Sequence, residues 1–281
     1  MSIDQGTLYV VATPIGNLDD MSPRAVRILS SVDRIAAEDT RHSRPLLQHF
    51  GIHTPMSALH EHNEREQAPR LLTALEGGES VALISDAGTP LISDPGYHLV
   101  RMARARGIAV VPVPGPSALM AALSAAGLPT DRFVFEGFLP SKAAARRGRL
   151  QALARETRTL VFFESPHRIS SALEDMVAVF GPQRQAVLAR ELTKAFETVR
   201  GDSLQQLADW VCDDANQRRG ELVLLVHGAE EAPADGHRES ERVLELLLEE
   251  LPVKQAASLA ARITGAGRND LYRRALELAG K

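Results

Sequence analysis

Short apolar runs alternate with helical patterns along most of the chain, and this alternation constrains the fold more than any other feature. The first runs predict buried strands at residues 7–12, 33–37, 81–85 and 109–112. Helices are expected between them, near residues 41–49, 64–76 and 96–106. Ser22 and Pro23, an N-cap residue followed by a proline at the first helical position, mark a further helix start. Strand, helix and strand at this spacing predict a mainly parallel sheet with helices on both faces.

A Pro- and Gly-rich segment at residues 112–116 interrupts this pattern. Ser117 is expected to cap an Ala-rich helix that runs to about Ala126. Further strands are predicted at residues 133–137, 159–164, 185–191 and 221–226, and the segment 198–201 is a candidate for another. Helices are expected near residues 142–154, 167–179 and 203–213. The fold class is therefore α/β, with predicted domains at residues 1–115 and 116–230 and a mixed sheet in the second.

The carboxyl-terminal part has a different pattern. Residues 229–236 are small and acidic, with Pro and Gly, which is typical of a linker. Amphipathic helices are predicted at residues 239–250, 253–263 and 268–279, the last two joined by Thr264-Gly265-Ala266-Gly267. Two short helices joined by a Gly-containing turn have a helix-turn-helix outline, although a generic helical hairpin has the same outline. Residues 237–281 are thus predicted to form a helical extension.

Composition narrows the class of protein. The 281 residues carry a net charge of −4, so no overall positive field indicates a nucleic-acid partner. Residues 141–168 and 252–281 are nevertheless locally basic, which suits either anion contact or a solvated helix face. Cys212 is the only cysteine, which excludes an internal disulfide and a thiolate zinc site. With no signal-like start and no apolar run near ~20 residues, a cytoplasmic protein without a membrane span is expected.

Gly- and Pro-rich loops follow several of the predicted strands. Ligands of open α/β sheets bind beyond the carboxyl ends of the strands, where such loops lie. In the loop over residues 85–96, glycine and small residues let a ligand approach the backbone, and Asp86 is placed to accept a hydrogen bond. A tight turn in which Asp86 caps a backbone amide explains the same pattern. The loop has neither the Gly-Lys-Ser/Thr of a P-loop nor GxGxxG, which disfavours nucleoside triphosphatases and hydride-transferring enzymes.

Taken together, the segments TPIGNLDDMSPRA, AEDTRHS, SDAGTPLISDPG, VPGPSA, FFESPHR, ARELTK and GELVLLV resemble the tetrapyrrole methylase superfamily. The resemblance spans almost the whole chain, and the helical extension matches the RNA-modifying branch of that superfamily. It implies two α/β domains with S-adenosylmethionine in the cleft between them, and a homodimer. The implied reaction is 2′-O-methylation of a cytidine in the decoding region of 16S ribosomal RNA, in the small ribosomal subunit.

The resemblance also implies which residues hold the methyl donor. One side of the cofactor is expected to contact Asp86, Ala87, Gly88, Thr89, Ile92 and Ser93, and its other end Ser117 and Ala118. The second domain is expected to contribute Phe163, Ala189, Arg190 and Leu192. Pro14 and Gly16 shape the floor of the cleft, either by direct contact or through turn formation alone.

A ribose hydroxyl is a weak nucleophile, and its methylation benefits from a general base close to an aligned donor. Several polar clusters follow predicted strands, and the sequence does not choose among them. The candidate catalytic residues are Asp39, Arg41, His60, His62, Glu64, Glu164, Glu191 and Lys194. Asp39 and Arg41 form a structural salt bridge in the alternative interpretation. His60 and His62 lack a convincing third ligand, so no metal site is expected.

Arginines supply the candidate RNA contacts, because phosphate binding positions a protein on nucleic acid. These candidates are Arg146, Arg147, Arg149, Arg168, Arg268, Arg273 and Arg274, with Arg41 and Arg190 as further phosphate contacts at the cleft mouth. Two alternatives remain open. A methyltransferase for a small tetrapyrrole would share the fold, and arginines would suit the carboxylate groups of its substrate. A non-catalytic RNA-binding assembly protein could also keep the fold without turnover.

Overall fold

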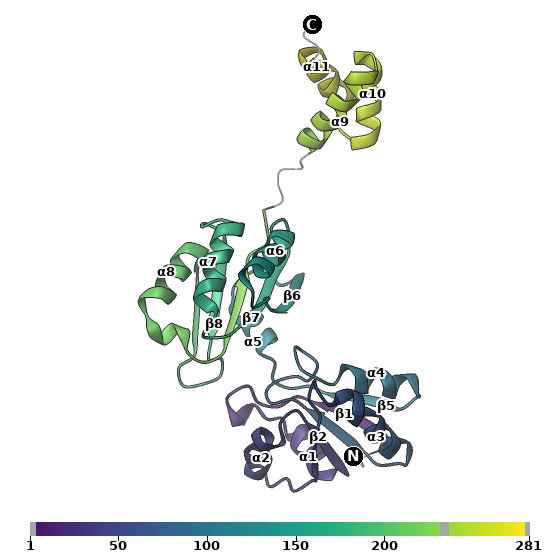
Figure 1. Cartoon of the computed structure of the whole chain (residues 1–281), viewed down its shortest axis with the longest axis vertical. Coiled ribbons are helices and arrows are strands. Elements are labelled where there is room, and N and C mark those ends of the chain that lie inside the picture. The colour runs from purple at the N-terminus through teal and green to yellow at the C-terminus, as the bar shows by residue number, and fades with distance from the viewer. Residues whose placement is uncertain (1–3, 231–235, 279–281) are drawn as a thin grey trace. The chain divides into compact units, whose positions relative to one another are not determined.

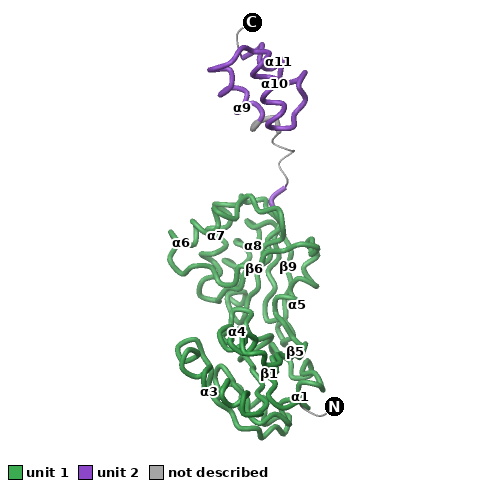
Figure 2. Tube along the Cα trace, turned by 90° about the vertical axis from the view of Figure 1, so that its right-hand side faces the viewer, with its two compact units in different colours: residues 1–228 green, residues 229–281 purple. Residues whose placement is uncertain are grey.

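The computed structural model of the chain describes residues 4–230 and 236–278. Two compact units are present, Met1–Gly228 and Ala229–Lys281 (Figure 2). The first unit contains two five-stranded sheets, and the described part of the second unit is helical (Figure 1). Within the described residues, no helix is both long and apolar enough to cross a membrane.

The first sheet is parallel throughout, as the alternation predicts. Its strand order is β3-β2-β4-β1-β5. The strands are β1 (Thr7–Val11), β2 (Arg34–Ala37), β3 (Met56–Ala58), β4 (Val81–Ile84) and β5 (Ala109–Val113). The short edge strand β3 was not predicted, because MSA carries too few apolar residues to show a period.

Helices cover both faces of this sheet, since both faces of each central strand are apolar. The short helix η1 (Leu18–Asp20) precedes the helices α1 (Pro23–Ser31), α2 (Thr40–His49), α3 (Glu64–Glu76) and α4 (Tyr97–Ala105). Helices α1 and α2 pack on the face that carries Val11 and Ile35. Helices α3 and α4 pack on the face that carries Leu8 and Leu83. The Ser22 side chain accepts a hydrogen bond from the Ala25 amide, which confirms the predicted N-cap.

The proline-rich segment begins inside the sheet rather than after it. Pro112 and Val113 belong to β5, which extends the predicted strand by one residue. Pro112 is tolerated there because β5 is an edge strand and its missing N–H faces no neighbour. Helix α5 (Ala118–Ala125) then begins after Ser117, which takes the N-cap position without making a capping hydrogen bond. The prediction that its side chain caps the helix was therefore wrong, and the hydroxyl is available for other contacts.

The second sheet is mixed, as predicted, with the order β6-β7-β10-β8-β9. Its strands are β6 (Phe133–Phe138), β7 (Thr159–Glu164), β8 (Gln185–Arg190), β9 (Thr198–Ser203) and β10 (Leu222–Val226). Strands β6 and β7 are parallel, whereas β10 runs antiparallel to β7 and β8, and β9 antiparallel to β8. The candidate strand near residue 198 is thus β9, an edge strand.

The two faces of the second sheet have different cover. The helices α6 (Ala143–Leu153), α7 (Ile169–Phe180) and α8 (Leu204–Asp213), followed by η2 (Ala215–Arg218), are the remaining helices of this unit. Side chains such as Phe162 and Leu188 pack in the core formed with α6, α7 and α8. Alternate residues such as Val161 and Val187 face the other way and pack against α5 and Ile15. This second face is where the first and second halves of the unit meet.

The second unit has its own core. Its helices are α9 (Gly236–Glu250), α10 (Val253–Thr264) and α11 (Arg268–Leu278). Leu244, Ala257 and Leu271 are buried together, and no residue of the first unit belongs to this described cluster. Gly265 ends α10 in the left-handed conformation, at φ 73°, which a glycine adopts without strain. The two helices flanking that turn match the predicted hairpin outline, and residues 231–235 of the predicted linker lie outside the described residues.

Candidate functional site

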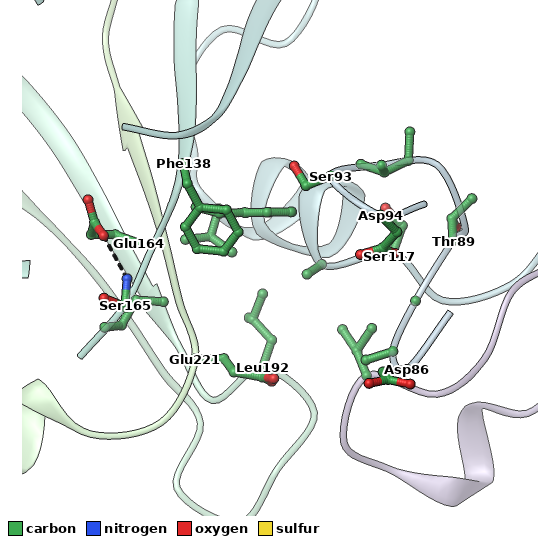
Figure 3. Close-up of a pocket in the computed structure, with 18 of the residues that line it drawn as sticks. Asp86, Thr89, Ser93, Asp94, Ser117, Phe138, Glu164, Ser165, Leu192 and Glu221 are labelled. Atoms are coloured by element: carbon green, nitrogen blue, oxygen red, sulfur yellow. Dashed lines mark hydrogen bonds between the residues drawn. The ribbon is translucent and has the colours of Figure 1, made fainter. Parts of the chain in front are cut away.

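A cavity of about 400 Å³ is lined by residues from both halves of the first unit (Figure 3). Such a volume lies within the range of small-molecule and cofactor sites. The half that holds the parallel sheet contributes Ile15, Glu38, Asp86, Ala87, Gly88, Thr89, Ile92, Ser93, Asp94, Ser117 and Ala118. The half that holds the mixed sheet contributes Phe138, Phe163, Glu164, Ser165, Pro166, Leu192, Gly220, Glu221, Leu222 and Val223.

The loop after β4 forms much of one wall. Gly88 has φ 82° and pairs with Thr13 in an isolated antiparallel bridge, which brings the loop after β4 against the end of β1. The Thr89 hydroxyl donates to the Pro116 carbonyl at 3.0 Å and ties the same loop to the segment after β5. Leu91 and Ser93 also have positive φ angles, of 73° and 68°, which is uncommon for residues other than glycine. Backbone strain of this kind clusters at functional sites.

Carboxylates Glu38, Asp86 and Asp94 lie on this wall. Burial raises the pKa of Asp94 to about 6, and the negative charges of Glu38 and Asp86 add to the shift. Burial also raises the pKa of Glu38, with Asp86 as the next cause. Asp86 accepts a hydrogen bond from the backbone amide of Asp39 at 3.0 Å, so it both fixes the turn before α2 and lines the cavity. A cationic ligand would relieve the repulsion among these carboxylates, and a hydroxyl group of a ligand could donate a hydrogen bond to one of them.

The opposite wall combines aromatic and acidic groups. Phe163 is flanked by Phe135 and Phe138, with ring centroids 4.9 and 5.8 Å away and edge-on geometry. Burial raises the pKa of Glu164, whose carboxylate accepts from the Ser165 amide at 2.8 Å and pairs with Arg168 at 3.3 Å. Glu164 is therefore held in place by its neighbours, and the apolar surface beside it suits a planar ligand.

The turn after β8 closes one side of the cavity through Leu192. Lys194 pairs with Glu191 at 2.8 Å and with Glu221 at 2.9 Å. The stem of Lys194 lies over Gly16, where a Cβ atom would come within 2.4 Å of the Lys194 Cγ atom. Gly16 therefore serves as a surface on which the turn from the other half rests.

Most of the predicted cofactor contacts line the cavity. These are Asp86, Ala87, Gly88, Thr89, Ile92, Ser93, Ser117, Ala118, Phe163 and Leu192. Pro14, Gly16, Ala189 and Arg190 are not among the lining residues. Ala189 is fully buried behind the wall, and the Arg190 guanidinium donates to the Phe196 carbonyl at 3.0 Å. These residues support the loops around the cavity, and Ile15 is the residue of the first loop that reaches it.

The candidate catalytic residues are scattered. Glu164 lines the cavity. Glu191 and Lys194 do not line it, but Lys194 forms ion pairs with Glu191 and with the lining residue Glu221. Hydrogen bonds from Arg41 lower the pKa of Asp39 to about 2, so Asp39 is a weak base. Asp39 and Arg41 form the salt bridge of the alternative interpretation, at 3.0 Å on the exposed surface.

The remaining candidates lie outside the cavity lining. The rings of His60 and His62 are 6.1 Å apart in the turn before α3. Glu64 is buried, and its carboxylate accepts from the backbone amides of His98 and Leu99 at 2.9 and 3.2 Å. Because these amides belong to the first turn of α4, Glu64 stabilises a helix terminus. Among the described residues, no group of three or more His, Cys, Asp or Glu side chains is placed to hold a metal ion.

Asp94, Phe138 and Glu221 were not among the predicted site residues, and Glu38 was included only as part of the polar cluster that follows the second predicted strand. Glu38 directly follows β2, and Asp86 lies two residues after the end of the neighbouring strand β4, so both stand at the carboxyl ends of parallel strands, which was the available signal. Nothing in the sequence indicates that residues 89–94 turn back to place Asp94 beside Glu38, because this depends on the left-handed residues Leu91 and Ser93.

The predicted RNA-contacting arginines differ in accessibility. Arg146 is buried and pairs with Asp175 at 2.7 Å, which rules out the predicted phosphate contact in this structure. Arg147 and Arg149 are half-exposed and pair with Asp175 and Glu136.

Other arginines of that set also have intramolecular partners. Arg168 donates to the Leu139 carbonyl and pairs with Glu164. In α11, Arg274 pairs with Glu241 and Glu277, whereas Arg273 lies 3.9 Å from Asp270 and is largely exposed. Arg268 and Arg273 are both exposed in this helix.

Comparison with known proteins gives two family matches that together span most of the chain. Residues 7–208 match the model for Tetrapyrrole (Corrin/Porphyrin) Methylases, and residues 234–279 match the model for the RsmI C-terminal HTH domain. The second match falls on the second compact unit.

Curated relatives match over nearly the full length. The chain is 65% identical over 278 residues to Ribosomal RNA small subunit methyltransferase I of Pseudomonas aeruginosa, covering 98% of this chain and 99% of the relative. It is 60% identical over 267 residues to the protein of the same name from Xylella fastidiosa, covering 95% of this chain and 98% of the relative.

Solved structures share the fold of the first unit at lower identity. A uroporphyrin-III-C-methyltransferase from Thermus thermophilus has a TM-score of 0.57 at 20% identity, covering 79% of this chain and 94% of its own. A further structure of uroporphyrin-III C-methyltransferase from the same organism, complexed with S-adenosyl homocysteine, has a TM-score of 0.54 at 19% identity, covering 79% of this chain and 97% of its own.

Proposed function

Because the chain belongs to the tetrapyrrole methylase family, we propose that it transfers a methyl group from S-adenosylmethionine to a ribose 2′-oxygen of 16S ribosomal RNA, at a cytidine of the decoding region. The observation that carries this proposal is identity of 65% with a ribosomal RNA small subunit methyltransferase along 98% of the chain. Relatives at this identity share a fold and an enzyme class, so the chain is a methyltransferase.

The helical unit favours RNA over a small tetrapyrrole as the acceptor. The solved uroporphyrin-III methyltransferase covers 79% of this chain, whereas the match to the RsmI C-terminal HTH domain accounts for residues 234–279. In α11, Arg268 and Arg273 are exposed and can contact phosphate groups. We propose that this unit anchors the RNA, while methyl transfer takes place in the first unit.

The cavity fits S-adenosylmethionine by size and by chemistry. Its volume of about 400 Å³ suits a ligand of that class, and Gly88 lets a ligand approach the backbone closely. Ser117 has no capping bond and leaves its hydroxyl free for a polar contact. The carboxylates Asp86 and Asp94 suit a positively charged ligand.

The protein's own part in the reaction is to orient, to exclude water and to accept a proton. When bound, S-adenosylmethionine supplies an electrophilic methyl group. We propose that Asp94 takes up the proton of the ribose hydroxyl, because it lines the cavity and its pKa of about 6 leaves it ionised yet basic at neutral pH. Glu164, the predicted candidate that also lines the cavity, is held by Ser165 and Arg168 and suits a positioning role.

Methyl transfer from labelled S-adenosylmethionine to small ribosomal subunits that lack the modification tests the function. Nucleoside analysis of the product should give labelled 2′-O-methylcytidine. If the protein binds S-adenosylhomocysteine but no label reaches the RNA, the assignment of RNA as the acceptor is overturned. Tetrapyrroles would then be tested as acceptors. RNA binding with neither cofactor binding nor turnover would identify a non-catalytic assembly protein.

We also propose that the enzyme acts as a homodimer, as the family resemblance implies. The mass of the protein in solution, measured by light scattering, should be twice the 30.5 kDa of one chain. A mass of 30.5 kDa across the concentrations used for turnover would contradict this.

A further inference from the structure

Strand β6 contains a bulge that changes the direction of its last side chain. In the pairing with β7, Phe135 lies opposite Val161, but Gly137 lies opposite Phe162 and Phe138 opposite Phe163. Glu136 is therefore the extra residue of a β-bulge. Gly137 has φ 64°, a left-handed conformation that glycine adopts without strain.

The bulge moves Phe138 to the other face of the sheet. Side chains alternate between the two faces of a strand, so a regular β6 would place Phe138 on the face of Val134, which packs against the core under α6 and α7. With the bulge, Phe138 joins the face of Phe163, and the two rings lie edge-on at 5.8 Å. Bulges next to active sites commonly redirect a side chain in this way.

On that face Phe138 projects into the cavity (Figure 3). The residue is 55% exposed, whereas Ile15 and Leu192 in the same lining are 7% and 8% exposed. Phe138 is therefore the aromatic group at the open side of the cavity, next to the more buried Phe163. A large apolar ring that is this exposed is suited to contact a ligand that enters from solvent. It is less suited to contact a ligand that is buried deep in the cavity.

We propose that Phe138 is the stacking surface for the base of the acceptor nucleotide, turned out of the RNA strand into the cavity. This proposal rests on the proposed function. To bring a ribose hydroxyl to a methyl donor inside the cavity, the nucleotide must leave its stack, and enzymes that act on single nucleotides replace the lost stacking with an aromatic side chain. Asp94, across the cavity from the aromatic wall, is then on the side of the sugar.

Base stacking on an aromatic ring weakens by roughly tenfold to a hundredfold when the ring is replaced by alanine. Phe138→Ala should therefore lower the affinity for RNA and raise KM for the small subunit, and Phe138→Tyr should restore both. Because the side chain is more than half exposed, the alanine variant should fold with an unchanged melting temperature. Phe196→Ala is the matched control, since Phe196 is 75% exposed and is not among the lining residues.

The direct readout is a fluorescent cytidine analogue placed at the acceptor position of a 16S ribosomal RNA fragment, measured without cofactor. Wild type, Phe138→Tyr and Phe196→Ala should change its emission on binding, and Phe138→Ala should not. S-adenosylhomocysteine affinity, measured by calorimetry, should stay within about twofold in all variants.

Two results would overturn the proposal while leaving the proposed function intact. An emission change in Phe138→Ala equal to that of wild type would remove the stacking role. A tenfold or greater loss of S-adenosylhomocysteine affinity in Phe138→Ala would assign the ring to the cofactor instead. Failure of the wild-type protein to methylate small subunits would overturn the proposed function and this inference together.

Discussion

Asp94 illustrates how the neighbourhood of a single residue sets its chemistry. Burial, with the charges of Glu38 and Asp86, raises its pKa to about 6, so it is mostly ionised at pH 7.5 and becomes protonated as the pH falls through 6. A base must be unprotonated to act, and kcat/KM reports the pKa values of the free enzyme, so kcat/KM should fall below about pH 6. Asp94→Asn should lower kcat by about a hundredfold or more at pH 7.5. Rate measurements across pH, with S-adenosylhomocysteine calorimetry on the same variant, check this.

Asp94 should also affect how the stability of the ligand-free protein depends on pH. Because the folded pKa of Asp94 exceeds the ordinary value of 3.8, the folded state binds a proton between about pH 6 and that value while the unfolded state does not. Proton uptake by Asp94 should therefore increase the free energy of unfolding as the pH falls through this window. This increase should be absent in Asp94→Asn. An asparagine variant with an unchanged pH–rate profile would transfer the role of base to another group.

At the level of single residues, sequence could predict which side chains the Gly- and Pro-rich loops bring to the site but not the partners that fold toward them. Asp86, Gly88 and Ser117 lie within four residues of the carboxyl ends of β4 and β5, so the rule for parallel sheets places them at the site. Arg146 looked like a surface cation in a basic stretch. Its burial against Asp175 depends on the packing of α6 on α7, which no local pattern encodes.

At the scale of the elements, the contact between the turn after β8 and Gly16 leads to a specific prediction. Glu191 and Thr193 have positive φ angles of 51° and 67°, and Lys194 holds the turn by packing on Gly16. In Gly16→Ala the new Cβ would displace the Lys194 stem and weaken its ion pairs. We expect a decrease in the free energy of unfolding of about 1–3 kcal/mol. Cofactor affinity should fall several-fold, because Leu192 in this turn lines the cavity.

Gly51→Ala is the control for Gly16→Ala. Gly51 also has a positive φ, of 66°, but a Cβ there would meet nothing within 4 Å. This variant should therefore be destabilised through backbone strain alone and keep its S-adenosylhomocysteine affinity. Equal decreases in affinity in the two variants, measured by calorimetry beside thermal unfolding, would show that Lys194 has no part in shaping the cavity.

Strands with a clear hydrophobic pattern could be predicted from the sequence, but irregularities within the strands could not. The strands β1, β4 and β10 are continuous apolar runs and were placed within a residue or two. The bulge in β6 was invisible, because FVFEGF has the same alternation with or without an extra residue. The side on which Phe138 lies is decided by Gly137, whose left-handed conformation is a property of the paired strands.

At the scale of the whole molecule, the separation into two units follows from how apolar side chains are distributed. The described core of α9, α10 and α11 contains no residue from the first unit, and the cavity lining contains none from the second. The boundary between the units falls at the acidic, Pro- and Gly-containing stretch that the sequence marks as a linker, whereas the predicted boundary at residues 115–116 lies inside the first unit. The sequence could not indicate which side chains of α11 remain accessible, since the pairing of Arg274 with Glu241 joins two helices.

Independent cores predict independent functions. A chain lacking residues 237–281 keeps every residue of the cavity lining and every described core cluster of the first unit. It should therefore fold and bind S-adenosylhomocysteine with wild-type affinity, while its affinity for ribosomal RNA falls. In the full-length protein, Arg268→Ala with Arg273→Ala should weaken RNA binding in the same direction. For each phosphate that is no longer neutralised, the slope of log affinity against log salt should decrease in magnitude by roughly 0.7 to 0.9.

Arg274→Ala is the contrasting variant, because its guanidinium pairs with Glu241 and Glu277. Its main effect should be on the melting of the helical unit, with a smaller change in the salt slope. Filter binding over a salt series and calorimetry with S-adenosylhomocysteine would separate these effects. A folded truncation that no longer binds S-adenosylhomocysteine would contradict the division of labour, because the helices would then be required to form the cofactor site.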